Sequence, residues 1–263
     1  MVRSLWTAAS GMIGQQASID TISNNLANVN TSGYKKMRAD FEDLIYQTVR
    51  VAGTPATEDT VVPVPVQMGH GVKLAATPRQ FTQGNLQNTE SFTDIAIMGD
   101  GFFRVMMYDG SYAYSRDGAF KIDSNGQFVT SNGYKLMPEV VLPQDFIPET
   151  LSISQDGRIN VKVPAGRPRR RRQAGTVPLC QPRRPDRRGK NLFKLSNASG
   201  DPLPGRPGFD GMGKTIHKFL EMSNVSVVRE MVNMIVAQRA YEFNSKAIQT
   251  SDNMLGTATN LKR

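Results

Sequence analysis

The sequence has few of the residue types that disulfide scaffolds, metal sites and histidine-based enzymes need. Cysteine occurs once, at Cys180, which excludes an internal disulfide framework and a zinc site built from several cysteines. The histidines are His70 and His217, so a histidine-based site would need both or depend on one. No set of polar residues predicts catalysis, a cofactor or a metal ion, and we expect a protein that is not an enzyme.

The sequence also lacks a long uninterrupted apolar run. The stretch of residues 6–19 is broken by threonine, serine, glycine and glutamine, so a cleaved secretory signal is not expected. No run approaches the length needed to cross a bilayer. We therefore expect no membrane insertion, and any export should use a route without a cleaved signal.

Positive charge is concentrated in one segment. Residues 166–189 contain nine arginines and one acid, Asp186, a net charge of +8, so the rest of the chain carries only +1 of the total of +9. This Arg/Pro-rich segment admits three interpretations: a disordered anion-binding arm, a solvated loop, or sequence foreign to the surrounding domain. The location of the charge argues against nucleic-acid binding by the chain as a whole.

Apolar and small residues recur at helical spacing near the start of the chain. They are Leu5, Ala8, Met12, Ile19, Ile22, Leu26 and Val29, with one interruption at Gln15. Gaps of three and four residues are typical of a heptad stripe on a helix. We predict a helix from about residue 4 to residue 28, with Gly33 beyond its end as a stop.

A second long helix is predicted from about residue 227 to residue 260. Ser226 is a suitable N-cap, and Glu230 in the first turn complements the helix dipole. Two neighbouring apolar stripes run along this helix, which predicts two packing neighbours. One comprises Ala237, Ala240, Ala247, Met254, Ala258 and Leu261, and the other Val227, Met231, Met234, Tyr241, Ile248 and Leu255. We expect the terminal helices to pack on each other and on other chains.

The sequence between these helices is mostly β-like. Residues 93–163 alternate apolar and other side chains and repeat Asn-Gly or Asp-Gly turns, which predicts an antiparallel domain. The Gly99-Asp100-Gly101-Phe102-Phe103 motif lacks the later residues of a phosphate loop and is expected to be a hairpin turn before a buried strand. Residues 37–49 have helical apolar spacing, and the Pro-containing residues 51–66 predict an extended connector.

The predicted fold class is therefore α+β, with a coiled-coil-like terminal domain and a central antiparallel β-rich domain. We assign residues 1–45 and 220–263 to the helical assembly domain and 46–80 and 200–219 to connectors. Residues 81–199 form the β-rich domain, with the Arg/Pro-rich segment inside it.

Asparagines cluster at the end of the first helix, at Asn24, Asn25, Asn28 and Asn30. They could be caps of a fraying helix end, with an Asx turn. They could also form a polar contact that fixes helix register, as a buried asparagine does in coiled coils. The residue chemistry leaves both open.

Several motifs resemble those of the bacterial flagellar rod and hook proteins. Ser23-Asn24-Asn25-Leu26-Ala27-Asn28 with Thr31-Ser32-Gly33-Tyr34-Lys35 is similar to their N-terminal signature. Glu221-Met222-Ser223-Asn224-Val225 and the residues from Gln238 to Ala247 are similar to their C-terminal signature. Gly99-Asp100-Gly101-Phe102-Phe103 and Tyr114-Ser115-Arg116-Asp117-Gly118 also match. The opening residues 3–12 and Thr82-Gln83-Gly84-Asn85-Leu86 most resemble the distal rod subgroup.

The resemblance implies a structural part of the distal rod, which polymerises helically into the drive shaft that transmits torque and is needed for motility. It implies self-association, contacts with proximal rod proteins, the hook protein and the P-ring and L-ring bushings, and uncleaved export through the flagellar type III apparatus. The expected assembly interface comprises Leu5, Met12, Ile19, Ile22, Asn24, Asn25, Leu26, Asn28, Val227, Met231, Met234, Tyr241, Ile248 and Leu255. The alternatives are a hook or proximal rod protein and, from another class, a basic nucleic-acid-binding protein.

The Arg/Pro-rich segment departs from the family pattern, which is mixed and partly apolar there. Arginine, proline and glycine share GC-rich codons, so our hypothesis is that compensating insertions and deletions, or a sequencing error, put this stretch out of frame. Mass spectrometry of the native protein should then find no Arg/Pro-rich peptides from residues 166–189. Detection of such peptides would refute the hypothesis.

Overall fold

The computed structural model describes residues 2–53, 55–57, 60–61, 63–143, 146–162, 172–176, 179–181, 186–189, 191–195, 202–209 and 211–260. The chain divides into two compact units. The helical unit comprises residues 1–27, 36–80 and 225–263, and the β-rich unit comprises residues 28–35 and 81–224. The fold class is α+β, as the sequence predicted, with a helix at each end and antiparallel strands between them.

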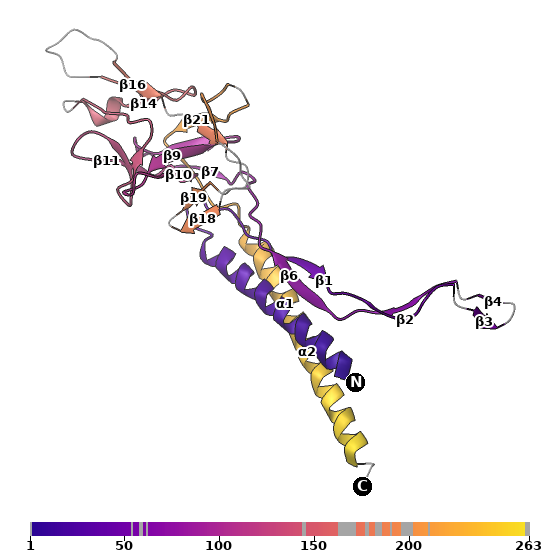
Figure 1. The fold of residues 1–263 in the computed structure, drawn as a ribbon. Coiled ribbons are helices and arrows are strands. Elements are labelled where there is room, and N and C mark those ends of the chain that lie inside the picture. The colour runs from indigo at the N-terminus through magenta and orange to yellow at the C-terminus, as the bar shows by residue number, and fades with distance from the viewer. Residues whose placement is uncertain are drawn as a thin grey trace. The chain divides into compact units, whose positions relative to one another are not determined.

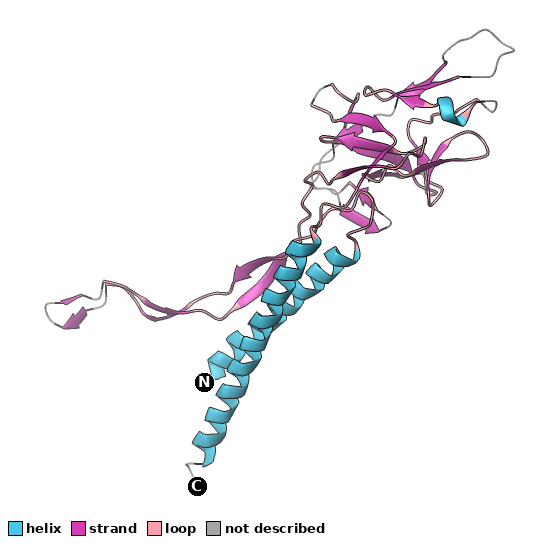
Figure 2. Ribbon diagram, turned by 180° about the vertical axis from the view of Figure 1, so that it is seen from behind, coloured by secondary structure: helices cyan, strands magenta, loops and turns pink. Residues whose placement is uncertain are grey.

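Two antiparallel helices form the body of the helical unit. Helix α1 spans Val2–Ala27 and helix α2 spans Val227–Asn260, close to the predicted bounds. They lie side by side in both ribbon views (Figures 1 and 2). At 1.5 Å per residue, α2 is about 50 Å long. The coiled-coil character expected of this pair stays a prediction.

A two-stranded arm leaves the helices and ends in a tip distant from them (Figure 1). It is built from successive antiparallel pairs, β1 with β6, β2 with β5, and β3 with β4. The strands are β1 (Asp40–Asp43), β2 (Gln47–Arg50), β3 (Pro55–Thr57), β4 (Thr60–Val61), β5 (Val66–Met68) and β6 (Val72–Ala76). Its base contacts α1, where the Val72 N–H donates to the Ser10 hydroxyl at 3.4 Å.

The helix predicted for residues 37–49 is wrong, because these residues form β1 and β2. Phe41 pairs with Leu74, and Gln47 with Met68. These partners lie 33 and 21 residues later in the chain, so local apolar spacing could not reveal them. The stretch expected as an extended connector, residues 51–66, forms the outer part of the arm where it is described.

The β-rich unit is a set of small antiparallel sheets. Among its described residues, the main sheet has nine strands, in the order β11-β12-β13-β9-β10-β19-β18, with β17 joining β9 to β20. Its strands are β9 (Phe102–Met106), β10 (Tyr112–Ser115), β11 (Phe120–Ile122), β12 (Phe128–Thr130), β13 (Lys135–Leu136), β17 (Leu179–Gln181), β18 (Asp186–Gly189), β19 (Leu192–Lys194) and β20 (Leu203–Gly205).

The other strands described in this unit form three smaller sheets. The first has the order β14-β15-β16, and the other two pair β21 with β8 and β22 with β7. The strands are β7 (Leu86–Asn88), β8 (Ile95–Met98), β14 (Ser152–Ile153), β15 (Arg158–Val161), β16 (Arg172–Thr176), β21 (Lys214–His217) and β22 (Phe219–Glu221), with a 3₁₀ turn, η1 (Pro148–Thr150), before β14. One of the predicted Asp-Gly turns, Asp156-Gly157, joins the antiparallel pair β14 and β15.

The predicted turn chemistry is right at four positions and wrong at one. Gly110, Gly126, Gly133 and Gly157 all have positive φ, as tight turns after asparagine or aspartate need. Gly118 does not. A Cβ at Gly118 would lie 1.7 Å from the Ile95 carbonyl oxygen, so this glycine is needed for close backbone approach. The Gly99–Phe103 stretch does lead into the buried strand β9, but it links two sheets and is not a hairpin turn, because β8 pairs with β21.

The core of the β-rich unit combines aliphatic and aromatic side chains. Phe103, Phe120 and Phe128 are buried with Ile95, Val105, Leu136 and Ile159 in one cluster. A second cluster joins Phe81, Phe102 and Phe193, whose ring centroids lie 5.6–5.7 Å apart in edge-to-face contacts. Such contacts stabilise beyond the area that they bury.

The Arg/Pro-rich segment is described only in part. Residues 166–171, 177–178 and 182–185 lie outside the described residues. The stretches between them supply β16, β17 and β18, whose backbones pair with β15, β9 and β19 respectively. Strand pairing therefore continues beyond residue 165, where the apolar alternation of the sequence stops.

Candidate functional site

A carboxylate lies at the centre of a buried polar cluster in the β-rich unit. Glu221, on β22, is 1% exposed and accepts hydrogen bonds from Lys35 Nζ at 2.7 Å and Arg116 Nε at 2.6 Å. The Gly84 N–H donates to the same carboxylate at 2.9 Å. Three segments that are far apart in the sequence thus meet on one side chain.

The donors around Glu221 are themselves tied to further backbone. Lys35 Nζ also donates to the Thr82 carbonyl at 2.8 Å, and the Arg116 guanidinium donates to the carbonyls of Gly99 and Gly101. The Gly33 N–H donates to the Glu221 carbonyl at 2.7 Å. Residues of all five motifs in this unit that carry the family resemblance, at 31–35, 82–86, 99–103, 114–118 and 221–225, therefore contact one another in this cluster.

Two cations share one carboxylate in this cluster. Burial lowers the pKa of Lys35 below its usual value of 10.5, and the Arg116 charge acts in the same direction. The Glu221 charge and hydrogen bond act to raise that pKa, but burial outweighs them. The protonated amine is thus held at a cost in free energy that the unfolded chain does not have.

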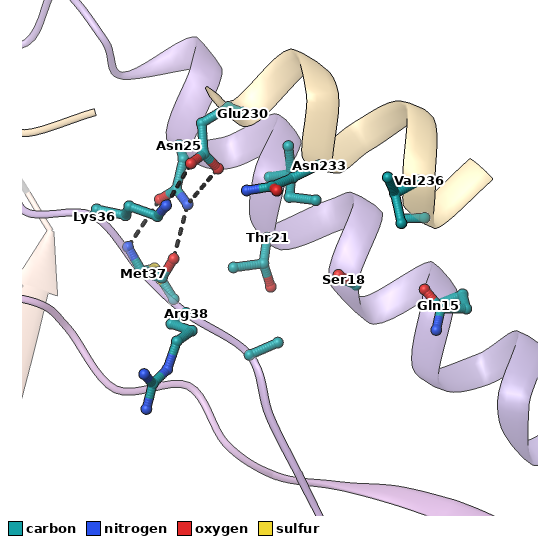
Figure 3. Close-up of a pocket in the computed structure, with 13 residues that line it drawn as sticks. Gln15, Ser18, Thr21, Asn25, Lys36, Met37, Arg38, Glu230, Asn233 and Val236 are labelled. Carbon is teal, nitrogen blue, oxygen red and sulfur yellow. Dashed lines mark hydrogen bonds and ion pairs between the residues drawn. The ribbon is translucent and has the colours of Figure 1, made fainter. Parts of the chain in front are cut away.

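A second polar cluster lies in the helical unit, where α1 ends and α2 begins (Figure 3). Glu230, buried in the first turn of α2, forms an ion pair with Lys36 Nζ at 2.5 Å and accepts from Asn25 Nδ2 at 3.4 Å. The Asn25 side chain also accepts from the Met37 N–H at 2.9 Å and donates to the Met37 carbonyl at 2.8 Å. One amide thus joins α1, α2 and the segment entering the arm.

The asparagine cluster divides between the two roles considered for it. Asn25 is buried and makes the contact just described, whereas Asn24 is exposed. Asn28, in the β-rich unit, accepts from the Thr31 hydroxyl at 3.4 Å in the turn that follows the helix. Within this chain, Asn25 links the helices and Asn28 belongs to a turn.

Three contacts define the register of the helix pair. The Ser4 and Ser251 hydroxyls are hydrogen bonded at 3.3 Å, and Asn25 bonds Glu230. Between them, a Cβ at Gly11 would lie 2.8 Å from Asn244 Nδ2, so these residues are in close contact. From one contact to the next, the number of residues advanced along α1 equals the number moved back along α2. By the same count, Ser18 faces Ala237.

The seam between the helices is made mainly of small and polar residues. On α1 it follows Ser4, Ala8, Gly11, Gln15, Ser18, Ile22 and Asn25 at alternating gaps of four and three. Only Glu230, Ala237 and Ser251 are buried among the described side chains of α2. Little apolar area is removed from water by this pair, so its own packing contributes modestly to stability.

The residues predicted to form the assembly interface fall on different parts of the helix surfaces. Leu5, Met12, Ile19, Leu26, Met234, Ile248 and Leu255 are half-buried, Ile22 is buried, and Val227, Met231 and Tyr241 are exposed. On α1, Leu5, Met12, Ile19 and Leu26 each directly follow a seam residue. This aliphatic stripe is therefore rotated by about 100° around the helix from the seam. Their role between copies stays a prediction.

Large apolar side chains are exposed on the helix faces opposite the seam. On α1 they are Trp6 and Ile13, both 71% exposed. On α2 they are Val228, Val232, Ile235 and Phe243, which gather opposite Glu230, Ala237 and Ser251 at 100° per residue. The arm adds Ile45, Val49, Val64 and Val66. Apolar surface of this extent on a helix marks an interaction site.

Comparison with known proteins identifies the family. Models of the flagella basal body rod protein, the flagellar hook protein FlgE/F/G D1 domain and the flagellar basal body rod FlgEFG protein C-terminal match residues 5–35, 96–161 and 217–261. The chain is 56% identical over 264 residues to the flagellar basal-body rod protein FlgG of Borreliella burgdorferi, covering both chains completely. The chain belongs to the FlgG family of flagellar basal-body rod proteins. It is a structural component of the rod.

Other relatives support this assignment. The FlgG of Buchnera aphidicola subsp. Schizaphis graminum is 44% identical across 97% of this chain and 98% of its own length. The flagellar hook protein FlgE of Helicobacter mustelae is 45% identical, but over only 51% of this chain and 30% of its own length. Full-length similarity to FlgG therefore distinguishes the chain from the hook protein.

The features that other functional classes would need are not found where the structure is described. Among the described residues, no His, Cys, Asp and Glu side chains gather in a group that could hold a metal ion. Nor does any described helix have the length and apolarity to span a membrane. His70 lies in a loop of the arm, and the structure describes only the backbone of Cys180.

Sequence reasoning missed the charged residues of both clusters. The sequence pattern marks Glu230 only as a partner of the helix dipole, and it marks Lys35, Arg116 and Glu221 only as parts of motifs. Local patterning cannot pair Lys35 with Glu221, which lies 186 residues away. The usable signal was that Lys35, Arg116 and Glu221 each stand inside a motif that carries the family resemblance, whereas Lys36 and Glu230 do not.

We predict that Glu230→Ala destabilises the helical unit by about 1–3 kcal/mol, because the Lys36 amine and the Asn25 amide lose a buried acceptor. The measurement is denaturant unfolding of the full chain followed by far-UV circular dichroism. The control is Glu242→Ala, whose exposed carboxylate pairs with Arg239 at 3.0 Å and should contribute less than about 1 kcal/mol. Equal effects of the two substitutions would contradict the role of Glu230.

The lowered pKa of Lys35 predicts a specific pH dependence. Between that pKa and 10.5 the unfolded chain binds more protons at this residue than the folded chain, so stability should rise with pH. The test compares unfolding free energies of the wild type and Lys35→Met from neutral pH to pH 10.5. The unfolding free energy of the wild type minus that of Lys35→Met should increase as pH increases. Movement the other way would mean that Glu221 raises the pKa of Lys35 despite its burial.

Proposed function

We propose that this FlgG-family chain polymerises into the distal part of the flagellar rod and transmits torque from the motor towards the hook. The observation that carries the proposal is the contrast between the two sides of the terminal helices. The seam within one copy is small and polar, whereas the opposite faces expose large apolar side chains. Such helices gain more from neighbours of the same kind than from each other.

The free energy available from these faces supports a polymer. Full burial of one large aliphatic or aromatic side chain contributes about 1.5–3 kcal/mol. The free energy gained by covering Val228, Val232, Ile235 and Phe243 on α2 would exceed the free energy gained by packing at the small seam. The predicted interface residues that are half-buried, such as Ile19 and Ile248, would be covered by the same neighbours.

The arm could make the polymer stiff enough to transmit torque. It is a two-stranded ribbon, and an isolated two-stranded hairpin is marginally stable in water. Ile45 and Val66 are exposed on it. Neighbouring copies that cover these side chains would brace the arm and stiffen the assembly.

The remaining expectations follow from the family. We infer a chain without enzymatic activity or cofactor, exported through the flagellar type III apparatus without cleavage. Its neighbours would be other copies, proximal rod proteins, the hook protein and the P-ring and L-ring bushings. Crosslinking in purified basal bodies would separate a distal from a proximal position. Salt-dependent DNA binding that disappears on deletion of residues 166–189 would instead favour the nucleic-acid alternative.

A double substitution on the exposed face tests assembly separately from folding. Val232→Asp with Phe243→Asp should change the unfolding free energy by no more than about 0.5 kcal/mol, because both side chains are exposed. The variant should not sediment as polymer and should not restore swimming to cells lacking the protein. The control is Gln238→Asp with Gln249→Asp, at exposed polar positions of α2, which adds the same charge. This variant should still sediment as polymer and should restore swimming. Polymerisation of the first variant would refute the proposed interface.

A further inference from the structure

The helix pair contains a hollow of about 260 Å³ on one side of its seam (Figure 3). Its walls include Ser18, Thr21 and Ile22 of α1 and Asn233, Val236 and Ala237 of α2. We call this the interhelical hollow. It arises because Ser18 faces Ala237, so that two small side chains meet at the same level of the pair. The space is much larger than one water molecule needs, and a cavity of about 150 Å³ already accepts a benzene ring.

The lining of the hollow selects the chemistry of its occupant. Ile22, Val236 and Ala237 offer apolar surface, whereas Ser18, Thr21 and Asn233 carry oxygen atoms that can accept a hydrogen bond. The lining also includes the polar residues Gln15 and Asn25 and three charged residues, Lys36, Arg38 and Glu230. These charges are already paired, Lys36 with Glu230 and Arg38 with Asp40. A suitable occupant has a large apolar body with a single donor group. Tryptophan fits this description, since the indole ring is apolar and its N–H only donates.

The chain has one tryptophan, Trp6, and its side chain is 71% exposed on α1. Exposed Ile13 and Phe243 have no side-chain donor. The Tyr46 hydroxyl is already hydrogen bonded to Asp43, and Tyr241 lies on the seam side of α2. Among the described residues of the helical unit, Trp6 is thus the exposed aromatic donor best suited to the hollow.

Trp6 cannot occupy the hollow of its own chain. It lies twelve residues before Ser18 on the same helix, a separation of roughly 18 Å. We propose that the indole of Trp6 from one copy enters the interhelical hollow of a second copy. This inference rests on the proposed polymerisation and adds the contact that would set the offset between copies. For parallel neighbouring helix pairs, that offset is roughly 18 Å along the helix axis.

The single tryptophan provides a direct test. Full-length protein is compared as monomer and as sedimented polymer, with sedimentation and Trp6 fluorescence read separately. On polymerisation the emission should shift to shorter wavelength and acrylamide quenching should fall. Ser18→Leu, which fills the hollow, should abolish that shift. Ser23→Leu, the same apolar addition at an exposed position of α1, should preserve it.

The outcomes separate this proposal from the proposed function. Absence of any sedimenting polymer would contradict the proposed function, and this contact with it. Polymer with unchanged Trp6 emission would overturn only the docking of Trp6. A shift that persists in Ser18→Leu would place the indole elsewhere and would overturn it as well.

A crosslinking test avoids the risk that Ser18→Leu disturbs the helix pair. Trp6→Cys with Asn233→Cys, in a Cys180→Ser background, should form an interchain disulfide in polymer oxidised with copper phenanthroline. Within one chain these positions are too far apart, because the register places Trp6 about sixteen residues, or roughly 24 Å, from Asn233. Trp6→Cys with Glu242→Cys is the matched control and should remain uncrosslinked. Equal crosslinking of both pairs, or of neither, would overturn the proposal.

Discussion

The arrangement of the β-rich unit depends on the buried carboxylate of Glu221. Two cations and a backbone N–H converge on it, and each comes from a different stretch of sequence. Burying charges costs free energy that is recovered only when every partner is in place with good geometry. A partly assembled cluster would leave Lys35 or Arg116 charged and uncompensated. The cluster therefore favours one complete arrangement of its segments over partial ones.

The helical unit follows a different principle. Its seam is rich in serine, alanine, glycine and asparagine, which allow close approach but bury little apolar area. Specific polar contacts, such as those of Ser4 with Ser251 and Asn25 with Glu230, fix the register. The larger apolar side chains point away from the seam. Register is thus determined within the chain, whereas most of the apolar surface of the helices is left for neighbours.

The sequence predicted those features that depend on local pattern. The bounds of α1 and α2 followed from apolar spacing, and Asn-Gly and Asp-Gly pairs marked four turns whose glycines have positive φ. The arm was missed because Phe41, Leu44, Ile45 and Val49 satisfy helical spacing, while their strand partners lie much later in the chain. The Glu221 cluster could not be predicted from pattern at all, since ion pairing over such separations leaves no periodic signal.

Two adjacent lysines belong to the buried clusters of the two different units. Lys35 binds Glu221 in the β-rich unit, and Lys36 binds Glu230 in the helical unit. Each cluster is formed by residues of its own unit. The point where the chain passes from one unit to the next lies between these two residues, because shifting the chain by one residue would take Lys35 from Glu221 and Lys36 from Glu230. Two consecutive residues of the chain thus anchor two separate buried clusters, one in each unit.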